Sequence, residues 1–262
     1  MTNKTNKQPH RGIYLLPNLF TTAALFCGFY GIVASINGHF ETAAIAIFVA
    51  MVLDGVDGRV ARLTNTESDF GAEFDSLADM VSFGLAPALI MYLWTLSNFG
   101  KVGWLVSFIY VACAALRLAR FNTQASHSDK QYFQGLASPA AAAVVVGLIW
   151  NGEFIKDYLS VPTLQIVALV TTFLAGILMV SNVRYHSFKG VNWRSKVPFV
   201  TILMFVFVLV FVSAEPALVL FLIFFSYALA GPVVTLVLLR RRRAERKLLK
   251  QNSASVKKED VQ

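Results

Sequence analysis

Four aspartates lie in two consecutive apolar stretches of the chain, and each stretch is long enough to cross a membrane. Asp54 and Asp57 are three residues apart and Asp75 and Asp79 are four apart, so each pair falls on one side of a helix. An ionised side chain at mid-membrane depth costs about 3 kcal/mol, and such side chains usually face a cavity or a partner. Carboxylate oxygens are the ligands that hard divalent cations prefer. The four aspartates together predict a site for one or two divalent metal ions.

Small residues and an arginine accompany the acids. Gly58, Ala61 and Arg62 follow the first pair around the same side of its helix, and Gly71 lies one turn before Asp75. Small residues leave room for a ligand to approach the backbone closely, and an arginine can bind a phosphate that shares the metals. The combination predicts a metal–diphosphate site, in which two metals can clamp the oxygens of a phosphoryl transfer. Intramembrane acids also line ion paths, so a divalent cation transporter is the alternative class of protein.

The elements that position these residues are membrane helices. Hydrophobic residues make up 56% of the chain, charged residues make up 15%, and the mean hydropathy is +0.60, whereas a soluble domain carries about 25% charged residues. The 22 phenylalanines are too many for one globule in water to bury. Cys27 and Cys113 fall in separate apolar stretches, so we expect buried free thiols. The composition excludes a soluble protein and indicates a membrane protein.

The apolar stretches set the expected fold. A bilayer core about 30 Å thick takes about 20 apolar residues per helix. Eight segments approach this length, and they cover residues 19–36, 42–63, 71–96, 103–122, 136–150, 163–181, 197–213 and 217–239. Their apolar runs are continuous, without the alternation of a barrel strand. We predict an all-α fold: a polytopic transmembrane helical bundle of about eight spans.

The basic residues indicate which side of the membrane faces the cytoplasm. An even number of spans places both termini on one side, and the opposite side then keeps only Lys101 and Lys156 of the 23 basic residues. The positive-inside rule makes the basic side cytoplasmic. Trp94, Trp104 and Trp150 lie at helix ends on the opposite side, as in an aromatic belt. We therefore expect both termini and the acidic site at the cytoplasmic face.

The sequence from Asp54 to Asp79 resembles the signature of the CDP-alcohol phosphatidyltransferases. That signature is D-x-x-D-G-x-x-A-R, then eight residues, then G-x-x-x-D-x-x-x-D, and the chain matches it without a gap. The resemblance implies transfer of a phosphatidyl group from CDP-diacylglycerol to an alcohol, with release of CMP. It implies that Asp54, Asp57, Asp75 and Asp79 bind Mg²⁺ or Mn²⁺, as two ions, and that Asp79 also takes the proton of the attacking hydroxyl. Homodimers are usual in this family, and we expect one here.

Six residues are candidates for binding CDP-diacylglycerol. The resemblance places Gly58, Ala61 and Arg62 along the cytidine diphosphate, and Gly71 shares the small-residue face beside them. Asn18 and Thr21 lie at the start of the first span, near the expected cytidine site, although Asn18 could instead cap that helix. The acyl chains of the donor can stay in the bilayer while its head group reaches a cytoplasmic cavity.

The wider chain, over about residues 13–190, resembles the membrane-embedded phosphatidylserine synthases within that family. The stretches that carry this resemblance are LPNLFT at 16–21, DSLADMVSFG at 75–84, RLARFN at 117–122, LMVS at 178–181 and SFK at 187–189. The loop GLASP at 135–139 departs from the Gly-Leu-Pro that the resemblance leads us to expect. L-serine is therefore the expected acceptor alcohol, and glycerol 3-phosphate and inositol phosphate are the alternatives.

Serine is a zwitterion, so its site needs a cation for the carboxylate. Arg117 and Arg120 lie three residues apart at the cytoplasmic end of the fourth span, and Asn122 adds an amide. An arginine can bind a carboxylate through two parallel hydrogen bonds. Acceptors that carry a phosphate would also need arginine, and either arginine could instead fix the helix orientation at the headgroups. The three residues are candidates for serine binding and do not by themselves select the acceptor.

These interpretations divide the chain into four parts. A cytoplasmic N-terminal segment covers residues 1–18, the phosphatidyltransferase core of six spans covers 19–190, two further spans cover 191–239, and a basic, partly disordered cytoplasmic tail covers 240–262. The run Arg240–Lys247 directly follows the last span, so we expect it to lie on anionic lipid headgroups and not to bind nucleic acid. The expected location is the inner (cytoplasmic) membrane of a bacterium.

Overall fold

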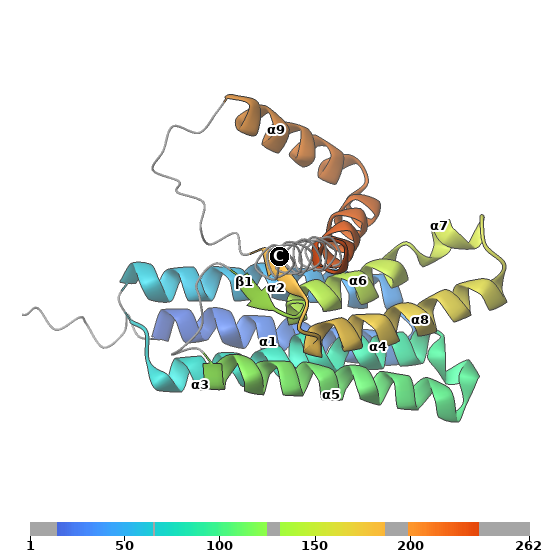
Figure 1. Cartoon of the computed structure of the whole chain (residues 1–262), viewed down its shortest axis with the longest axis horizontal. Coiled ribbons are helices and arrows are strands. Elements are labelled where there is room, and N and C mark those ends of the chain that lie inside the picture. Colours follow the sequence, from blue (N-terminus) through green and yellow to red (C-terminus); the bar gives the residue numbers. More distant parts are fainter. Residues whose placement is uncertain (1–14, 65, 125–131, 187–198, 236–262) are drawn as a thin grey trace, which may run out of the picture.

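The computed structural model describes residues 15–64, 66–124, 132–186 and 199–235. These residues form helices and one short two-stranded ribbon (Figure 1). The elements in chain order are α1 (Leu15–Ile36), α2 (Phe40–Thr64), α3 (Asp69–Asp79), the π-helix η2 (Met80–Leu85), α4 (Ala86–Trp94), the 3₁₀-helix η3 (Leu96–Phe99), α5 (Lys101–Gln124), β1 (Tyr132–Gln134), α6 (Ser138–Trp150), α7 (Gly152–Lys156), α8 (Val161–Val180), β2 (Arg184–His186) and α9 (Phe199–Ala214). A last helix, Pro216–Thr235, follows α9.

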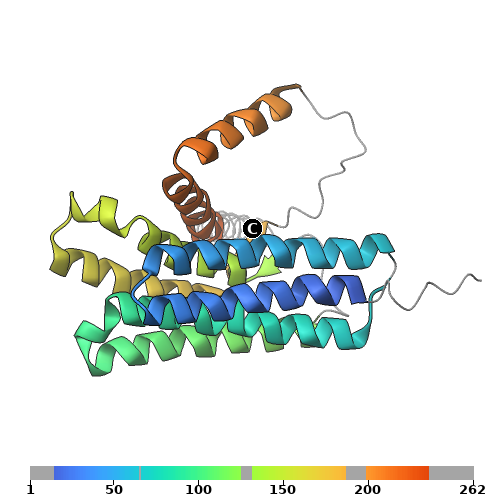
Figure 2. The same cartoon turned by 180° about the vertical axis from the view of Figure 1, so that it is seen from behind.

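The long helices form a bundle around a short central helix. Helices α1, α2, α5 and α8 run side by side with the continuous helix made by α3, η2 and α4 (Figures 1 and 2). Helix α6 contacts α2, α4 and α8, and every residue from Ala140 to Ile149 is buried. The many alanines and the glycine of α6 let neighbouring helices approach closely. Helix α9 stands apart from the bundle in both views.

The predicted spans coincide with helices. Five described helices are long and apolar enough to cross a membrane, and they are Leu16–Ile36, Asp69–Trp94, Lys101–Thr123, Val161–Val180 and Pro216–Thr235. Helix α2 has 25 residues but carries several charged side chains, and α6 and α9 have only 13 and 16 residues. The prediction of a helical, multi-pass membrane protein is confirmed. The count of eight spans and the cytoplasmic termini stay predictions.

The two-stranded ribbon departs from the all-α prediction. Strands β1 and β2 pair antiparallel, with Phe133 opposite Tyr185. The ribbon connects the segment before α6 to the segment after α8, because β1 precedes α6 and β2 follows α8. Strands of three residues are too short to show a periodic pattern in the sequence.

The helix that carries Asp75 and Asp79 changes its geometry directly after Asp79. Residues Met80–Leu85 are π-helical, and Pro87 lies in the first turn of α4. Proline has no N–H, so the ladder of helix hydrogen bonds is interrupted one turn earlier. The buried Tyr110 of α5 supplies a donor there, and its Oη donates to the Phe83 carbonyl oxygen at 3.1 Å. This bond ties α5 to the acid-bearing helix close to the acids.

Some predictions fall partly or wholly outside the described residues. They concern most of the N-terminal segment 1–18, the stretch 187–189 and the basic tail 240–262. Within the described part of the chain, Cys27 and Cys113 are both free, as predicted; Cys113 is buried and Cys27 is partly exposed.

Candidate active site

A short connection between α2 and α3 brings the two acidic stripes side by side. Helix α2 ends at Thr64 and α3 begins at Asp69, so the chain reverses within four residues. Ser68 caps α3, and its Oγ accepts a hydrogen bond from the Gly71 N–H at 3.1 Å. This cap satisfies one of the free N–H groups at the start of the helix. The hairpin therefore fixes how the two halves of the Asp54–Asp79 sequence face each other.

The four aspartates converge. Asp54, Asp57 and Asp75 each offer a carboxylate oxygen, and these oxygens all lie within 4.8 Å of one another. The side chain of Asp79 lies within hydrogen-bonding distance of Asp54. Asp57 is only 4% exposed, and Thr21 Oγ1 of α1 donates to its Oδ2 at 2.7 Å. The acids thus form one cluster, which we call the aspartate cluster, made of Asp54, Asp57, Asp75 and Asp79.

The aspartate cluster fits a divalent cation. Among the described residues, no lysine or arginine forms an ion pair with any of the four carboxylates. Asp75 Oδ1 is buried and has no hydrogen-bond partner within the described ranges. A buried carboxylate oxygen without a partner is strongly unfavourable unless something else binds it. Oxygen ligands of this kind and spacing suit a hard divalent ion.

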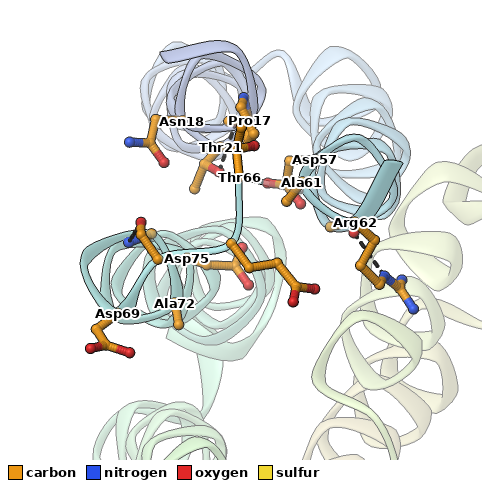
Figure 3. A pocket seen from close by; sticks show the side chains of 14 residues that line it. Pro17, Asn18, Thr21, Asp57, Ala61, Arg62, Thr66, Asp69, Ala72 and Asp75 are labelled. Carbon is orange, nitrogen blue, oxygen red and sulfur yellow. Dashed lines mark hydrogen bonds between the residues drawn. The ribbon is translucent and has the colours of Figure 1, made fainter. Parts of the chain in front are cut away.

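A cavity of about 460 Å³ opens on one side of the aspartate cluster. We call it the first cavity, and its lining residues are Pro17, Asn18, Thr21, Asp57, Gly58, Ala61, Arg62, Thr66, Glu67, Ser68, Asp69, Gly71, Ala72 and Asp75. Figure 3 shows residues of α1, α2 and α3 surrounding it. All six residues predicted to bind CDP-diacylglycerol line this cavity. The structure therefore brings these six residues together, as the sequence predicted, while their role in binding CDP-diacylglycerol stays a prediction.

Two of these residues show how the first cavity keeps its space. Nothing lies within 4 Å of the position that a Cβ would take at Gly58, so the missing side chain leaves open volume. At Gly71, the same position is 3.4 Å from Asn18 Oδ1, so the missing side chain lets α1 approach α3. Asn18 lies inside α1, which begins at Leu15, and does not cap that helix. Arg62 is exposed, and its Nε donates to the Gly58 carbonyl oxygen at 2.9 Å.

The α2–α3 connection contributes a part of the first cavity that was not predicted from the sequence. Thr66, Glu67 and Ser68 line the cavity together with Asp69 and Ala72. Thr66 is buried, and its hydroxyl lies 2.7 Å from that of Thr64. The signal for these residues was the fixed spacing of eight between the two halves of the signature, because a short connection must border the site that both halves form.

A second cavity of about 330 Å³ borders the other two members of the aspartate cluster, Asp54 and Asp79. We call it the second cavity, and it is lined by Asp54, Asp79, Arg117, Leu118, Phe121, Gly135, Ala137, Pro139 and Tyr227. Arg117 interacts electrostatically with Asp79, and its Nη1 donates to Ser138 Oγ at 2.6 Å. The aspartate cluster thus has Asp57 and Asp75 in the first cavity and Asp54 and Asp79 in the second.

The loop 135–139 is held in place by the end of α8. The N–H of Gly135 donates to the Val183 carbonyl oxygen and that of Leu136 to the Leu178 carbonyl oxygen, both at 2.9 Å. Gly135 has φ +81, and a Cβ there would overlap the Met179 carbonyl oxygen. Only glycine fits both the backbone angle and the close contact. This anchoring places Ala137 and Ser138 beside Arg117.

The other two residues predicted to bind serine lie outside both cavities. Arg120 Nη1 donates to the Val180 carbonyl oxygen at 3.1 Å and to Asn182 Oδ1 at 3.4 Å, so it joins α5 to the end of α8. Asn122 Nδ2 donates to Ser76 Oγ at 3.0 Å, so it joins α5 to α3. Of the three candidates, Arg117 alone lines one of these two cavities.

Comparison with known proteins agrees with this geometry. The family model for CDP-alcohol phosphatidyltransferase matches residues 14–152. A CDP-diacylglycerol–serine O-phosphatidyltransferase of Helicobacter pylori is 44% identical over 214 residues, which cover 82% of this chain and 89% of the relative. Proteins of the same name from Mycobacterium tuberculosis and Bacillus subtilis are 40% identical over 147 residues and 32% identical over 174 residues. These matches cover 53% and 66% of this chain and 51% and 91% of the relatives.

The family match spans the Asp54–Asp79 sequence and more than half of the chain. Residue types, geometry and similarity therefore agree on one class. The chain belongs to the CDP-alcohol phosphatidyltransferase family.

Proposed function

We propose that the chain transfers the phosphatidyl group of CDP-diacylglycerol to the hydroxyl of L-serine, giving phosphatidylserine and CMP. The observation that carries this proposal is that the aspartate cluster borders two cavities, with two of its members in each. One cavity contains every residue predicted to bind the donor, and the other contains a partly buried arginine that interacts with Asp79. The names of the relatives from three bacteria support serine as the acceptor.

The first cavity would hold the cytidine diphosphate part of the donor. Gly58 and Ala61 leave room for the diphosphate along α2, and Arg62 at the rim can turn from the Gly58 carbonyl oxygen toward a phosphate. Two ions, Mg²⁺ or Mn²⁺, held by Asp54, Asp57, Asp75 and Asp79 would neutralise the charge on the diphosphate and on the departing CMP. Thr21 would hold the Asp57 carboxylate in its orientation through the hydrogen bond already formed.

The second cavity would hold the acceptor. Arg117 would bind the serine carboxylate, and Ser138 Oγ would fix the direction of the guanidinium. Asp79 would take the proton of the serine hydroxyl while the serine oxygen bonds to the phosphorus and the bond from that phosphorus to CMP breaks. Arg120 and Asn122 stay predicted members of the serine site, and their contacts with α8 and α3 favour a role in placing α5.

The membrane arrangement belongs to the same proposal. We infer eight spans, with both termini and both cavities on the cytoplasmic side of a bacterial inner membrane. The charge distribution supports this, because only Lys101 and Lys156 lie on the opposite side. The core of six spans would cover residues 19–190, followed by two further spans to residue 239 and a basic tail, and two chains would form a homodimer.

The test is an acceptor screen with the purified full chain in lipid nanodiscs. CDP-diacylglycerol and Mg²⁺ or Mn²⁺ are supplied with L-serine, glycerol 3-phosphate or inositol phosphate in turn, and CMP release is measured. We expect release that depends on L-serine and stops when the metal is chelated. CMP release with another acceptor only would support phosphatidyl transfer but would show that serine is not the acceptor.

The transporter alternative makes the opposite prediction. A divalent cation transporter would move Mn²⁺ into proteoliposomes and release no CMP with any acceptor. We expect no Mn²⁺ uptake above that of empty liposomes, and uptake without CMP release would overturn the enzymatic proposal.

A further inference from the structure

The last helix, Pro216–Thr235, reaches the second cavity although it lies outside the family match. The match ends at residue 152, whereas Tyr227 of this helix lines the cavity together with Asp79 and Arg117. Tyr227 also interacts electrostatically with Arg117. A helix that the family match does not cover thus completes a wall of the proposed acceptor site.

The last helix is docked on the bundle along one of its faces. Asn151 Nδ2 donates to the Ala217 carbonyl oxygen at 2.8 Å, and a Cβ at Gly147 would be 3.0 Å from the Phe221 ring. One turn further, the ring centroids of Phe224 and Phe48 lie 6.3 Å apart. The contact positions 217, 221 and 224 follow the spacing of one helix face.

Tyr185 of the ribbon holds the far end of the same face. Its Oη donates to the Ala228 carbonyl oxygen at 2.9 Å, and its ring centroid lies 5.3 Å from that of Tyr227. A Cβ at Gly231 would overlap the Tyr185 ring, so the glycine permits this close packing. The docking positions therefore continue through 228 and 231. Contacts at both ends fix the rotation of the helix and so the direction of Tyr227.

The opposite face of the helix has a different character. Leu222, Phe225, Leu229 and Val233 are exposed large apolar side chains, as expected for a face toward lipid. Tyr227 is partly buried and has a polar end, so it differs from these four residues. Its phenol is both a donor and an acceptor of hydrogen bonds. A polar group placed next to Arg117 in a membrane helix is a candidate for ligand contact.

We propose that Tyr227 is a specificity-determining residue for the acceptor, and that its hydroxyl donates to the carboxylate that Arg117 binds. The inference rests on the proposed function, because it takes a small hydroxy amino acid as the occupant of the second cavity. Arg117 and Tyr227 would hold the carboxylate, and Asp79 would receive the proton of the hydroxyl. Acceptors without a carboxylate would lose both contacts.

The test compares Tyr227→Phe with Tyr185→Phe in the full chain in nanodiscs. Each change removes one phenol hydroxyl: Tyr227 belongs to the last helix, and Tyr185 of β2 packs against that helix. Tyr185 does not line the second cavity. For Tyr227→Phe we expect a KM for L-serine raised about tenfold, equivalent to about 1.4 kcal/mol, with kcat and the KM for CDP-diacylglycerol changed less than twofold. Tyr185→Phe is expected to lower the melting temperature without a selective change in the serine KM.

Serinol, which has hydroxyls and an amine but no carboxylate, separates contact from packing. Wild-type protein should use serinol poorly, and Tyr227→Phe should use it no worse than wild type, so the preference for serine over serinol falls about tenfold. An unchanged preference, or an equal loss with both acceptors, would overturn the assignment of Tyr227. Wild-type protein without serine-dependent CMP release would instead refute the proposed function, so the two failures are distinguishable.

Discussion

The two cavities border the same aspartate cluster but are built in different ways. The first cavity takes all of its lining from a stretch between residues 17 and 75, namely from α1, α2, α3 and the short α2–α3 connection. The second takes its lining from five places between Asp54 and Tyr227: α2, α3, α5, the loop 135–139 and the last helix. One is a local structure, and the other depends on the packing of the whole bundle.

This difference matches the two halves of the proposed reaction. A donor that is common to a family can be bound by one compact sequence pattern, because the same cytidine diphosphate always occupies it. An acceptor that varies requires residues that can change independently, and separate segments allow this. The family match covers the whole lining of the first cavity but leaves out Tyr227 of the second.

The largest effect is expected for Asp79→Asn, which tests whether the second cavity contains the general base. The change keeps the size of the side chain but removes its capacity to take a proton, so kcat should fall about 10³-fold or more. The Kd for CDP-diacylglycerol should change little, because the first cavity is lined by Asp57 and Asp75. The measurements are CMP release and donor binding to the same preparation.

Glu73→Gln is the matched control for Asp79→Asn. Glu73 is an exposed carboxylate on α3 that lines neither cavity. We expect its substitution to leave kcat within twofold of wild type. If Asp79→Asn also keeps wild-type turnover, Asp79 is not the general base, and the second cavity contains no assigned catalytic residue.

A smaller effect, restricted to the acceptor, is expected for Arg117→Ala. Loss of a charge-assisted contact with the serine carboxylate, worth about 1.5–3 kcal/mol, should raise the serine KM about 10- to 100-fold. The donor KM should stay the same. Steady-state kinetics with each substrate varied in turn measure both values.

Arg120→Ala gives the comparison on the same helix. Arg120 contacts the Val180 carbonyl oxygen and Asn182 at the end of α8 and lines neither cavity. Its loss should lower the melting temperature and raise the serine KM less than the loss of Arg117 does. A larger effect at Arg120 would mean that Arg120, and not Arg117, binds the serine carboxylate. The second cavity would then not be the serine site.

The sequence predicted the first cavity better than the second. Asn18, Thr21 and Gly71 could be assigned to one place because a short connection makes α2 and α3 antiparallel and the first span packs beside them. Helix spacing likewise predicted that the four aspartates converge. Within the described residues the predicted spans also coincide with helices, because continuous apolar runs of this length have few alternatives in a membrane.

The lining of the second cavity depends on how the helices pack, and the spacing of residues along the sequence does not show this. The three serine-site candidates lie within six residues of one another, yet each contacts a different helix. Arg117 contacts α6, Arg120 contacts α8 and Asn122 contacts α3. Helical spacing tells which residues share a face but not which helix covers that face. Tyr227 lies more than 100 residues from Arg117, and only the docking of the last helix brings the two together.

An effect on the first cavity is expected for Thr21→Val. Valine keeps the shape of threonine but removes the hydrogen bond from Thr21 Oγ1 to Asp57 Oδ2, and a hydrogen bond to a charged group is worth about 1.5–3 kcal/mol. The donor KM and the metal concentration for half-maximal activity should both rise about tenfold. The serine KM should not change. The measurement is a metal titration of CMP release at several donor concentrations.

The neighbouring Thr22 provides the control for Thr21. Its hydroxyl is exposed and donates to the Asn18 carbonyl oxygen within α1 at 2.7 Å, and it lines neither cavity. Thr22→Val should leave the metal requirement as in wild type. Equal shifts in both variants would mean that α1 as a whole, and not the bond to Asp57, sets metal affinity.

The smallest effect is expected for Gly58→Ala, compared with Gly55→Ala. Both glycines are exposed positions of α2 where a Cβ meets nothing within 4 Å, so both substitutions should fold and gain about 0.5–1 kcal/mol of helix propensity. They differ only in that Gly58 lines the first cavity and Gly55 does not. A methyl group at Gly58 therefore occupies volume that the donor needs, and the donor KM should rise a few-fold while the serine KM stays constant. A donor KM that is unchanged in both variants would mean that the diphosphate does not lie along this part of α2, and the first cavity would then have to bind the donor through α1 and α3 alone.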